Sequence, residues 1–240
     1  MKAVILAGGL GTRLRSIVHD RPKAMAEFNA RPFLEYQLLM LKKNEVTNIV
    51  LCVGYKFQLI RDYFQQGDRL GLSIEYAVED KPLGTAGAIK NAERFLDSPF
   101  LVFNGDSFLD IDLEPFLQFH HKKNNNDSRY VASIVTTPTA DAKAYGSIST
   151  DSYQAILKFE EKRDGDGPRT INAGVYACLP AVLDFIPKNE HSSIERDTFP
   201  RILEGGFHLY AYPVSDHFID IGTPAGYVKF TDYIEEKYPC

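Results

Sequence analysis

Short apolar runs alternate with helix-like stretches through the first hundred residues, and this order constrains the fold more than any other feature. Two of the runs, Val50–Val53 and Phe100–Phe103, are continuously apolar, as strands covered on both faces should be. Alternating strands and helices predict a parallel, doubly wound sheet. The predicted strands are Lys2–Ala7, Asn48–Val53, Ser73–Ala77 and Phe100–Phe103, and the predicted helices are Pro32–Lys43, Phe57–Gln65 and Thr85–Phe95.

The second half of the chain has a less regular pattern. Gly146–Thr150 and Ala155–Glu160 flank a short polar turn and predict a hairpin. The other predicted strands are Tyr130–Thr136, Thr170–Cys178 and Phe207–Pro213, and the other predicted helices are Leu113–Lys122, Ser193–Leu203 and Pro224–Lys237. The 240 residues contain no linker, repeat or low-complexity tract. We therefore predict one domain built on a mixed sheet.

A glycine-rich turn follows the first predicted strand. The residues are Gly8, Gly9, Leu10, Gly11, Thr12 and Arg13. Glycine lets backbone N–H groups approach a phosphate chain closely, and the arginine adds full positive charge. The turn lacks the last glycine of the dinucleotide fingerprint, and the chain has no P-loop sequence. The turn predicts a nucleotide-phosphate site, with an ordinary tight turn as the alternative.

Composition excludes several classes of protein. The formal net charge is -5, which disfavours a nucleic-acid-binding surface. No apolar run approaches the length of a membrane span, and the first residues do not resemble a signal peptide, so we expect no membrane partner and a cytoplasmic location. Cys52, Cys178 and Cys240 lie far apart, which favours neither zinc nor a disulfide framework. Cys52 and Cys178 lie in apolar runs and are predicted core residues.

Two aspartates each follow an apolar run at a turn that contains glycine. Asp106 closes Phe103-Asn104-Gly105-Asp106, and Asp220 precedes Ile221-Gly222-Thr223. A single aspartate in such a place is more often a helix cap than a metal ligand. Two of them make a divalent cation site plausible, since Mg²⁺ prefers a few carboxylates with waters and substrate phosphates.

Three further residues and one segment could meet an anionic or hydroxylated ligand. Lys23 follows a proline and Lys162 follows two glutamates, although an isolated lysine is by default a solvated surface charge. Asn172 opens an apolar strand, so its amide either closes a turn or binds a hydroxyl. Pro82–Gly87 would place the N-terminal amides of a helix near a ligand.

Seven segments together resemble the sugar-1-phosphate nucleotidyltransferases, also called nucleoside-diphosphate-sugar pyrophosphorylases. They occur in the order typical of that family and span nearly the whole chain. The segments are Leu6–Leu14, Pro22–Met25, Pro82–Gly87, Asn104–Asp106, Phe159–Lys162, Asn172–Tyr176 and Asp220–Pro224. Within the family, the chain most resembles bacterial mannose-type guanylyltransferases, especially those for D-glycero-D-manno-heptose 1-phosphate. The resemblance implies an α/β, Rossmann-like three-layer fold with a mixed, mostly parallel central sheet. It also implies a single nucleotidyltransferase domain over residues 1–240.

The resemblance also implies roles for residues at matching positions. It implies catalytic roles for Arg13, Lys23, Asp106 and Asp220, with the two aspartates as the ligands of Mg²⁺. It implies nucleotide binding by Leu6, Ala7, Gly8, Gly9, Gly11, Thr12, Arg13, Lys23, Glu79, Pro82, Gly84, Thr85 and Asp106. It implies sugar-phosphate binding by Gly105, Gly146, Glu161, Lys162 and Asn172.

The implied reaction condenses a nucleoside triphosphate, by resemblance GTP, with a sugar 1-phosphate. The implied sugar is D-glycero-D-manno-heptose or mannose, in capsule or lipopolysaccharide synthesis, and a homodimer is a possible assembly. The chain departs from the family at Arg163, where proline is common, and at Phe218, near where tryptophan is common. Because of both changes, the resemblance does not determine which sugar the protein would use.

Three alternatives stay open. One is a thymidylyl-, uridylyl- or cytidylyltransferase acting on glucose 1-phosphate. The second is a nucleotide-sugar glycosyltransferase of related fold, for which Asp110-Ile111-Asp112 has a metal-binding spacing. The third is a nucleotide-sensing subunit without turnover.

Overall fold

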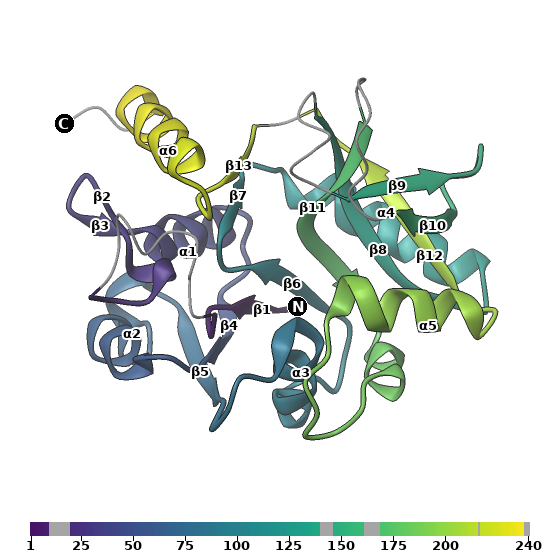
Figure 1. Ribbon diagram of the computed structural model, residues 1–240, viewed down its shortest axis with the longest axis horizontal. Helices are drawn as coiled ribbons and strands as arrows, with labels where there is room; N and C mark the ends of the chain where they lie inside the picture. Colours follow the sequence, from purple (N-terminus) through teal and green to yellow (C-terminus); the bar gives the residue numbers. More distant parts are fainter. Residues whose placement is uncertain (10–19, 140–145, 161–168, 216, 238–240) are drawn as a thin grey trace.

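The computed structural model describes residues 1–9, 20–139, 146–160, 169–215 and 217–237. Figure 1 shows the course of the chain. The strands are β1 (Lys2–Leu6), β2 (Glu27–Phe28), β3 (Arg31–Pro32), β4 (Asn48–Val53), β5 (Ser73–Val78), β6 (Phe100–Asn104), β7 (Ser107–Leu109), β8 (Tyr130–Thr139), β9 (Ser147–Thr150), β10 (Ile156–Glu160), β11 (Arg169–Cys178), β12 (His208–Pro213) and β13 (Phe218–Asp220). The α-helices are α1 (Phe33–Lys43), α2 (Phe57–Phe64), α3 (Gly84–Asn91), α4 (Leu113–Asn126), α5 (Phe199–Glu204) and α6 (Pro224–Lys237).

Seven strands form the central sheet in the order β12-β8-β11-β6-β1-β4-β5. β11 runs antiparallel to both of its neighbours, β6 and β8. The other four pairs of neighbours are parallel. The mixed, mostly parallel sheet predicted from the sequence is therefore confirmed, and β9 and β10 form the predicted hairpin beside it.

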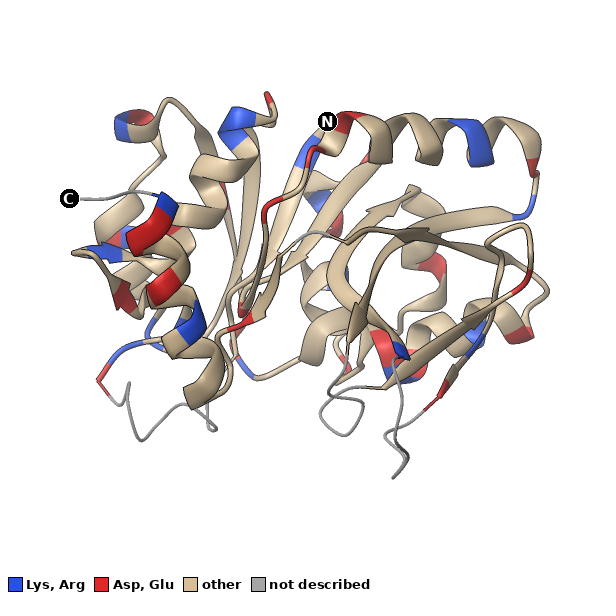
Figure 2. Cartoon of the chain, turned by 90° about the horizontal axis from the view of Figure 1, so that it is seen from above, with Lys and Arg blue, Asp and Glu red and all other residues tan. Residues whose placement is uncertain are grey.

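Helices cover both faces of this sheet, because successive side chains of a strand point to opposite faces. In β1, Ala3 and Ile5 belong to one buried apolar cluster and Val4 belongs to another. The first cluster contains residues of α1 and α6, whereas the second contains residues of α3 and α5. Two cores on opposite faces give three layers. The charged residues that Figure 2 colours blue and red lie mainly on the helices and loops.

Both cysteines that the structure describes lie in these cores. Cys52 and Cys178 are each fully buried and form no disulfide, as the sequence predicts for core residues. Burial raises the pKa of the Cys178 thiol to about 12. Within the described residues, no helix combines the length and the apolar character that crossing a membrane would require.

Some predicted elements differ from those in the structure. The segment Ser193–Leu203 was expected to form one helix, but it divides into a π-helical turn at Ile194–Thr198 and the helix α5. Pro200 lies in the first turn of α5, where its missing N–H costs no hydrogen bond. Likewise, the helix predicted over Thr85–Phe95 ends at Asn91, and a short 3-10 turn follows at Glu93–Phe95.

The pairing of β7 with β13 was not predicted from the sequence; the two strands are antiparallel and have three residues each. This pair brings the segment after residue 217 beside the segment after β6. The helix α6 follows β13 directly and is held by Phe230, whose ring lies 5.0 Å from that of Phe33 and 5.1 Å from that of Phe108. The pair therefore joins the last helix to the central sheet.

Gly226 allows α6 to begin close to β13. A Cβ atom at Gly226 would lie 1.7 Å from the carbonyl oxygen of Asp220, so no larger residue fits without a backbone shift. We expect Gly226→Ala to lower the free energy of unfolding by about 1–3 kcal/mol through overpacking. Thermal unfolding measures this effect. Val228→Ala, at a position that is 57% exposed on the same helix, is the control and should change little. Equal melting temperatures of Gly226→Ala and the wild type would contradict the close packing.

Candidate functional site

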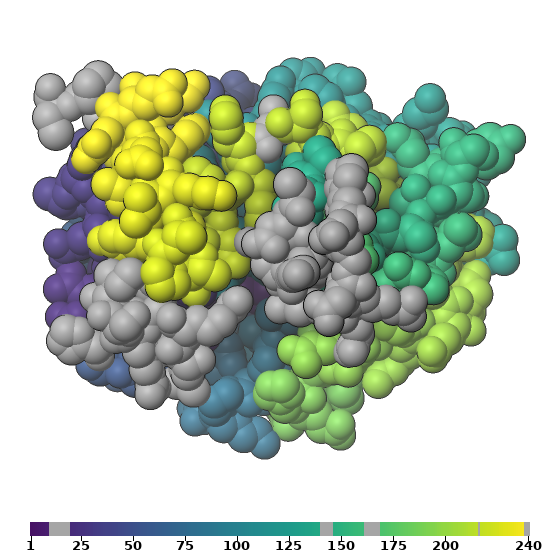
Figure 3. Space-filling view, turned by 45° about the horizontal axis from the view of Figure 1, so that its top comes forward, coloured from purple at the N-terminus to yellow at the C-terminus, as the bar shows by residue number. Residues whose placement is uncertain are grey.

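A cavity of about 540 Å³ opens at the carboxyl ends of the central strands. Parallel strands bring their carboxyl ends to one edge of the sheet, where ligands of such sheets bind. Eleven predicted site residues line the cavity: Leu6, Ala7, Gly8, Gly9, Lys23, Glu79, Pro82, Gly84, Thr85, Gly105 and Asp106. Its lining comes mostly from the N-terminal half of the chain, which is coloured purple to teal in Figure 3, and the C-terminal half adds His191 and Glu195. The eleven predicted residues come from five separate segments of the sequence, and the fold brings them together.

The ends of β1 and β6 are joined by backbone hydrogen bonds. Leu6 pairs with Asn104 in the sheet, and the N–H of Gly105 donates to the carbonyl oxygen of Leu6 at 3.2 Å. A Cβ atom at Gly105 would lie 2.3 Å from that oxygen, so the close approach requires glycine. This contact places the turn that carries Asp106 beside Leu6 and Ala7, just before Gly8 and Gly9.

Lys23 and Asp106 form an ion pair at this edge of the sheet. Lys23 Nζ lies 2.9 Å from Asp106 Oδ2, and the side chains are 11% and 38% exposed respectively. Lys23 begins a short 3-10 turn after Pro22, which positions the lysine rigidly. The pair places one cation and one carboxylate on the wall of the cavity. Among the described residues that line the cavity, Lys23 is the only lysine or arginine.

Asp106 and Asp220 lie on neighbouring segments because β7 pairs with β13. Asp220 is the register partner of Ser107, and the N–H of Ile221 donates to the carbonyl oxygen of Asp106 at 2.9 Å. Asp220 Oδ1 accepts a hydrogen bond from the N–H of Gly222 at 2.7 Å. Asp220 is not among the residues that line the cavity. The backbone pairing nevertheless brings the two predicted metal ligands to adjacent positions.

This donor set fits Mg²⁺. In the ranges that the structure describes, no three His, Cys, Asp or Glu side chains are grouped as a complete metal site. Mg²⁺ does not need such a group, because it keeps several waters and takes substrate phosphate oxygens beside one or two carboxylates. Two neighbouring aspartates at a predicted phosphate site are a suitable protein contribution.

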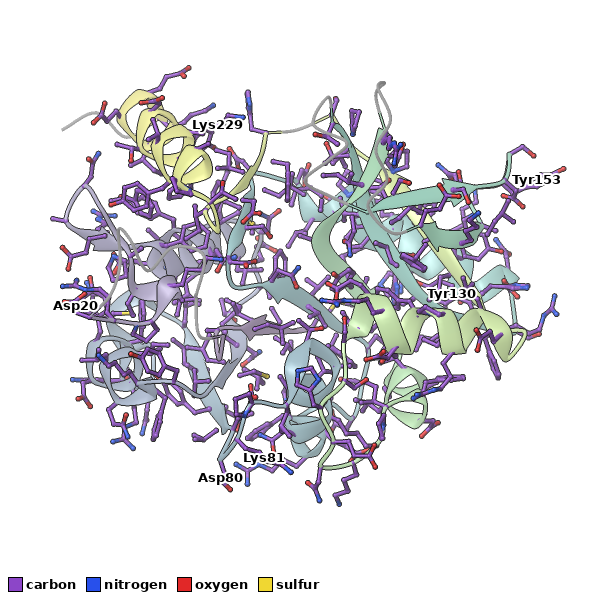
Figure 4. The ribbon with its side chains drawn as sticks, in the orientation of Figure 1. Asp20, Asp80, Lys81, Tyr130, Tyr153 and Lys229 are labelled. Carbon is purple, nitrogen blue, oxygen red and sulfur yellow. The ribbon has the colours of Figure 1, made fainter. Side chains whose placement is uncertain are left out.

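Glu79 lies against the backbone at Gly8. Its Oε2 accepts a hydrogen bond from the N–H of Leu83 at 2.9 Å, and a Cβ atom at Gly8 would lie 2.6 Å from its Oε1. Burial raises the pKa of the Glu79 carboxyl, and the hydrogen bond from Leu83 opposes that shift. The next two residues, Asp80 and Lys81, are exposed and lie at the edge of the molecule (Figure 4).

Two lining residues, His191 and Glu195, were not predicted from the sequence, and neither were Ala24, Ala88 and Asn104. Glu195 accepts hydrogen bonds from Tyr176 at 3.0 Å, from Thr85 at 3.2 Å and from Ser193 at 3.1 Å. The predicted nucleotide residue Thr85 is thereby tied to the segment that precedes α5. The only available signal was a carboxylate just before a proline-containing helix, which is too common to indicate a site.

Gly84 explains how this segment reaches the cavity. Gly84 has a φ of 73°, and a Cβ atom there would lie 2.5 Å from the carbonyl oxygen of Ser192. The N–H of Ala86 donates to the same oxygen at 2.9 Å. The first turn of α3 therefore binds the 190–194 segment, and glycine at position 84 is required by both conformation and space.

The structure describes only some of the residues that the resemblance assigns to sugar-phosphate binding. The Asn172 amide accepts a hydrogen bond from the N–H of Gly174 at 2.8 Å and so closes a turn. It also donates to the hydroxyl of Tyr176 at 2.8 Å, and that hydroxyl donates in turn to Glu195. Gly146 is exposed just before β9. Neither Asn172 nor Gly146 lines the cavity. Gly11, Thr12, Arg13, Glu161 and Lys162 lie outside the described residues.

Proteins of known sequence match the chain along its length. It is 36% identical over 236 residues to a D-glycero-alpha-D-manno-heptose 1-phosphate guanylyltransferase of Campylobacter jejuni, covering 96% of this chain and 98% of the relative. It is 35% identical over 229 residues to a mannose-1-phosphate guanylyltransferase of Mycobacterium tuberculosis, covering 95% of this chain but 62% of that longer relative.

Solved structures have the same fold. HddC from Yersinia pseudotuberculosis matches with a TM-score of 0.84 and 31% identity, covering 97% of this chain and 99% of HddC. HddC complexed with GMP-PN matches with a TM-score of 0.82 and 32% identity over the same shares. The predicted α/β, Rossmann-like fold is thus confirmed. A family profile described as nucleotidyl transferase covers residues 2–237. Because that match includes every segment on which the predicted resemblance depends, this chain belongs to the nucleotidyl transferase family.

Proposed function

We propose that this protein transfers a nucleotidyl group from GTP to a sugar 1-phosphate. An oxygen of the sugar phosphate attacks the α-phosphorus of GTP, the bond from that phosphorus to the β-phosphate oxygen breaks, and pyrophosphate leaves with the electron pair. The products are a GDP-sugar and pyrophosphate. The observation that carries the proposal is the cavity that Gly8, Gly9, Lys23 and Asp106 line together.

Charge repulsion is the main barrier to this reaction, because both substrates are polyanions. Two unit charges at ~4 Å repel by about 4 kcal/mol at an effective dielectric constant of ~20. Lys23 has three N–H donors, so it can keep its contact with Asp106 and still donate to a phosphate oxygen. The attacking phosphate is already largely ionised at neutral pH, so the reaction needs no general base. Orientation and charge stabilisation then supply the catalysis.

Asp106 and Asp220 are the residues that would hold Mg²⁺. When bound, the ion would neutralise phosphate charge and orient the triphosphate. The proposal depends on the β7–β13 pairing, which keeps the two aspartates on adjacent backbone segments. Arg13 and Lys162 are proposed to add positive charge on the nucleotide and sugar-phosphate sides.

The proposed sugar is D-glycero-D-manno-heptose, with mannose as the second candidate. The Campylobacter relative carries the heptose name and is covered over 98% of its length, whereas the mannose relative from Mycobacterium extends well beyond the matched region. The structure of HddC complexed with GMP-PN supports a guanine nucleotide. Thymidylyl, uridylyl and cytidylyl transfer to glucose 1-phosphate remains the alternative within the family.

The glycosyltransferase alternative depends on Asp110 and Asp112, and both carboxylates are engaged elsewhere. Asp110 accepts a hydrogen bond from the hydroxyl of Tyr233 at 2.7 Å. Asp112 caps α4 by accepting from the N–H of Glu114 at 3.0 Å. Neither residue lines the cavity. These contacts favour nucleotidyl transfer over glycosyl transfer.

A substrate matrix tests the proposal. Four nucleoside triphosphates are combined with the 1-phosphates of heptose, mannose and glucose, with Mg²⁺ present, and pyrophosphate release is measured. We expect the highest kcat/KM for GTP with the heptose or mannose compound. Faster turnover with dTTP or UTP and glucose 1-phosphate would move the protein to another branch of the family. Nucleotide binding without pyrophosphate release on any sugar would instead support the nucleotide-sensing alternative.

Further predictions concern the whole protein. We propose that residues 1–240 act as a single domain, that the protein works in the cytoplasm in capsule or lipopolysaccharide synthesis, and that it can assemble as a homodimer. Size-exclusion chromatography with light scattering tests the assembly.

A further inference from the structure

The turn that carries Asp106 is held at both of its ends by one buried side chain from another element. Gln37 lies in α1 and is 2% exposed. Its Nε2 donates to the carbonyl oxygen of Asn104 at 2.8 Å and to the carbonyl oxygen of Ser107 at 2.8 Å. These two carbonyls belong to the residues on either side of Gly105 and Asp106. One amide group therefore closes the turn across its open side.

The geometry fixes the orientation of the Gln37 amide. Both neighbours of Nε2 are carbonyl oxygens, which only accept hydrogen bonds, so the nitrogen and not the oxygen must face them. The other amide atom, Oε1, is buried and has no hydrogen-bond partner among the described residues. A buried acceptor without a partner lowers stability. An apolar side chain would avoid that penalty. What glutamine contributes at this position is therefore its two N–H groups, which donate to the two carbonyl oxygens.

Other contacts hold the turn through the backbone alone. The N–H of Gly105 donates to Leu6 in β1 at 3.2 Å, and the N–H of Ile221 in the segment after β13 donates to Asp106 at 2.9 Å. Gln37 contacts the turn from a third side. Because it does so with a side chain, a substitution at position 37 can release this restraint and leave the backbone contacts in place.

We infer that Gln37 is a positioning residue for Asp106, acting through the two carbonyls that flank the turn. The inference depends on the proposed function, in which Asp106 holds a divalent cation at the phosphate site. Without the two N–H groups, the facing carbonyls of Asn104 and Ser107 repel each other and the turn relaxes. The Asp106 carboxylate then moves away from the place where Lys23 now meets it. Partners one step removed from a metal typically change metal affinity or activity by about 10–100-fold.

Gln37→Met tests the inference, because methionine has a similar volume and no N–H group. We expect kcat to fall by about 10–100-fold. The KM for GTP and the KM for the sugar 1-phosphate should each change by no more than about threefold, since the lost contact acts on the transition state more than on substrate binding. The dissociation constant for Mn²⁺, measured by electron paramagnetic resonance with GTP analogue bound, should rise by about tenfold. The melting temperature should fall, because the carbonyl oxygens of Asn104 and Ser107 lose their donor, although removal of the unpaired Oε1 offsets part of that loss.

Tyr36→Phe is the matched control from the same helix. The Tyr36 hydroxyl donates to the carbonyl oxygen of Phe28 at 2.8 Å, so this variant also removes a buried bond from a side chain to the backbone. It leaves the 104–107 turn untouched. We expect a lower melting temperature with wild-type kcat and wild-type affinity for Mn²⁺. Both variants should therefore lose stability, but only Gln37→Met should lose kcat and affinity for Mn²⁺, a difference that a general loss of packing would not produce.

Gln37→Glu provides a second test that keeps the shape of the side chain. It replaces the donor with an acceptor facing the two carbonyls, so we expect kcat to fall at least as far as in Gln37→Met. Wild-type kcat and wild-type Mn²⁺ affinity in either folded variant overturn the inference. A wild-type protein that neither binds Mn²⁺ nor releases pyrophosphate overturns the proposed function instead, so the two failures are distinguishable.

Discussion

Asp106→Asn is expected to lose turnover by about 10²–10³-fold, the usual loss when one preorganised electrostatic group is removed. The Asp106 carboxylate lines the cavity and lies 2.9 Å from Lys23 Nζ. Asparagine keeps the shape but removes the charge that would hold the cation. The fold should persist, because backbone bonds to Leu6 and Ile221 hold the turn in either case. Steady-state kinetics over a range of Mg²⁺ concentrations, with thermal unfolding alongside, measures both effects.

Asp112→Asn is the matched control for this substitution. It lies six residues later, and its carboxylate caps α4. Asparagine caps helices about as well as aspartate, so stability and turnover should both stay near wild type. Full Mg²⁺-dependent activity in Asp106→Asn would remove that residue from the metal site. Loss of activity in Asp112→Asn with activity retained in Asp106→Asn would support the glycosyltransferase alternative. Asp220→Asn should behave like Asp106→Asn.

The strands that the sequence predicted best are those buried on both faces. β4 and β6 consist almost entirely of apolar residues, and every residue from Ile49 to Val53 is buried in the structure. Such strands need no side-chain alternation to be recognised. The apolar run before Asp220 indicated a strand end there, but three residues are too few to show a period, so the pairing of β7 with β13 was not predicted. The contact that places Asp220 beside the Asp106 turn was therefore invisible in the sequence, although the aspartate itself was predicted.

The residues that line the cavity also divide into those that the sequence predicted and those that it did not. Residues in the glycine turn and in the segment around Gly84 were predicted, because glycine and strand ends mark sites where a backbone approaches a ligand. Glu195 and His191 were missed. They reach the cavity because the carbonyl of Ser192 packs on Gly84, and that contact joins positions more than a hundred residues apart. Tertiary contacts of this range have no local sequence pattern.

Glu79→Gln is expected to reduce the preference for GTP over dTTP. The Glu79 carboxylate lines the cavity with one oxygen occupied by the N–H of Leu83 and the other against Gly8. We propose that it also accepts hydrogen bonds from N1–H and N2–H of guanine. Thymine lacks this pair of adjacent donors. In the glutamine variant an NH₂ group would face one of them, and a buried mismatch of this kind can cost a factor on the order of 10² in kcat/KM.

The measurement is kcat/KM for GTP and for dTTP with the same sugar 1-phosphate. GTP should lose about 10²-fold while dTTP changes little, because the phosphate contacts are common to both nucleotides. Asp80→Asn is the control, since it removes a carboxylate from the next position, which is exposed at the edge of the molecule (Figure 4). That variant should keep the wild-type ratio.

The ratio separates base recognition from a structural role. Glutamine can still accept from the N–H of Leu83 through its own carbonyl oxygen, so the loop after β5 should keep its conformation. A loop that was disturbed would weaken both nucleotides together and leave the ratio unchanged. Glu79 therefore binds guanine only if the loss falls on GTP alone, and an equal loss for both nucleotides assigns it to holding the loop.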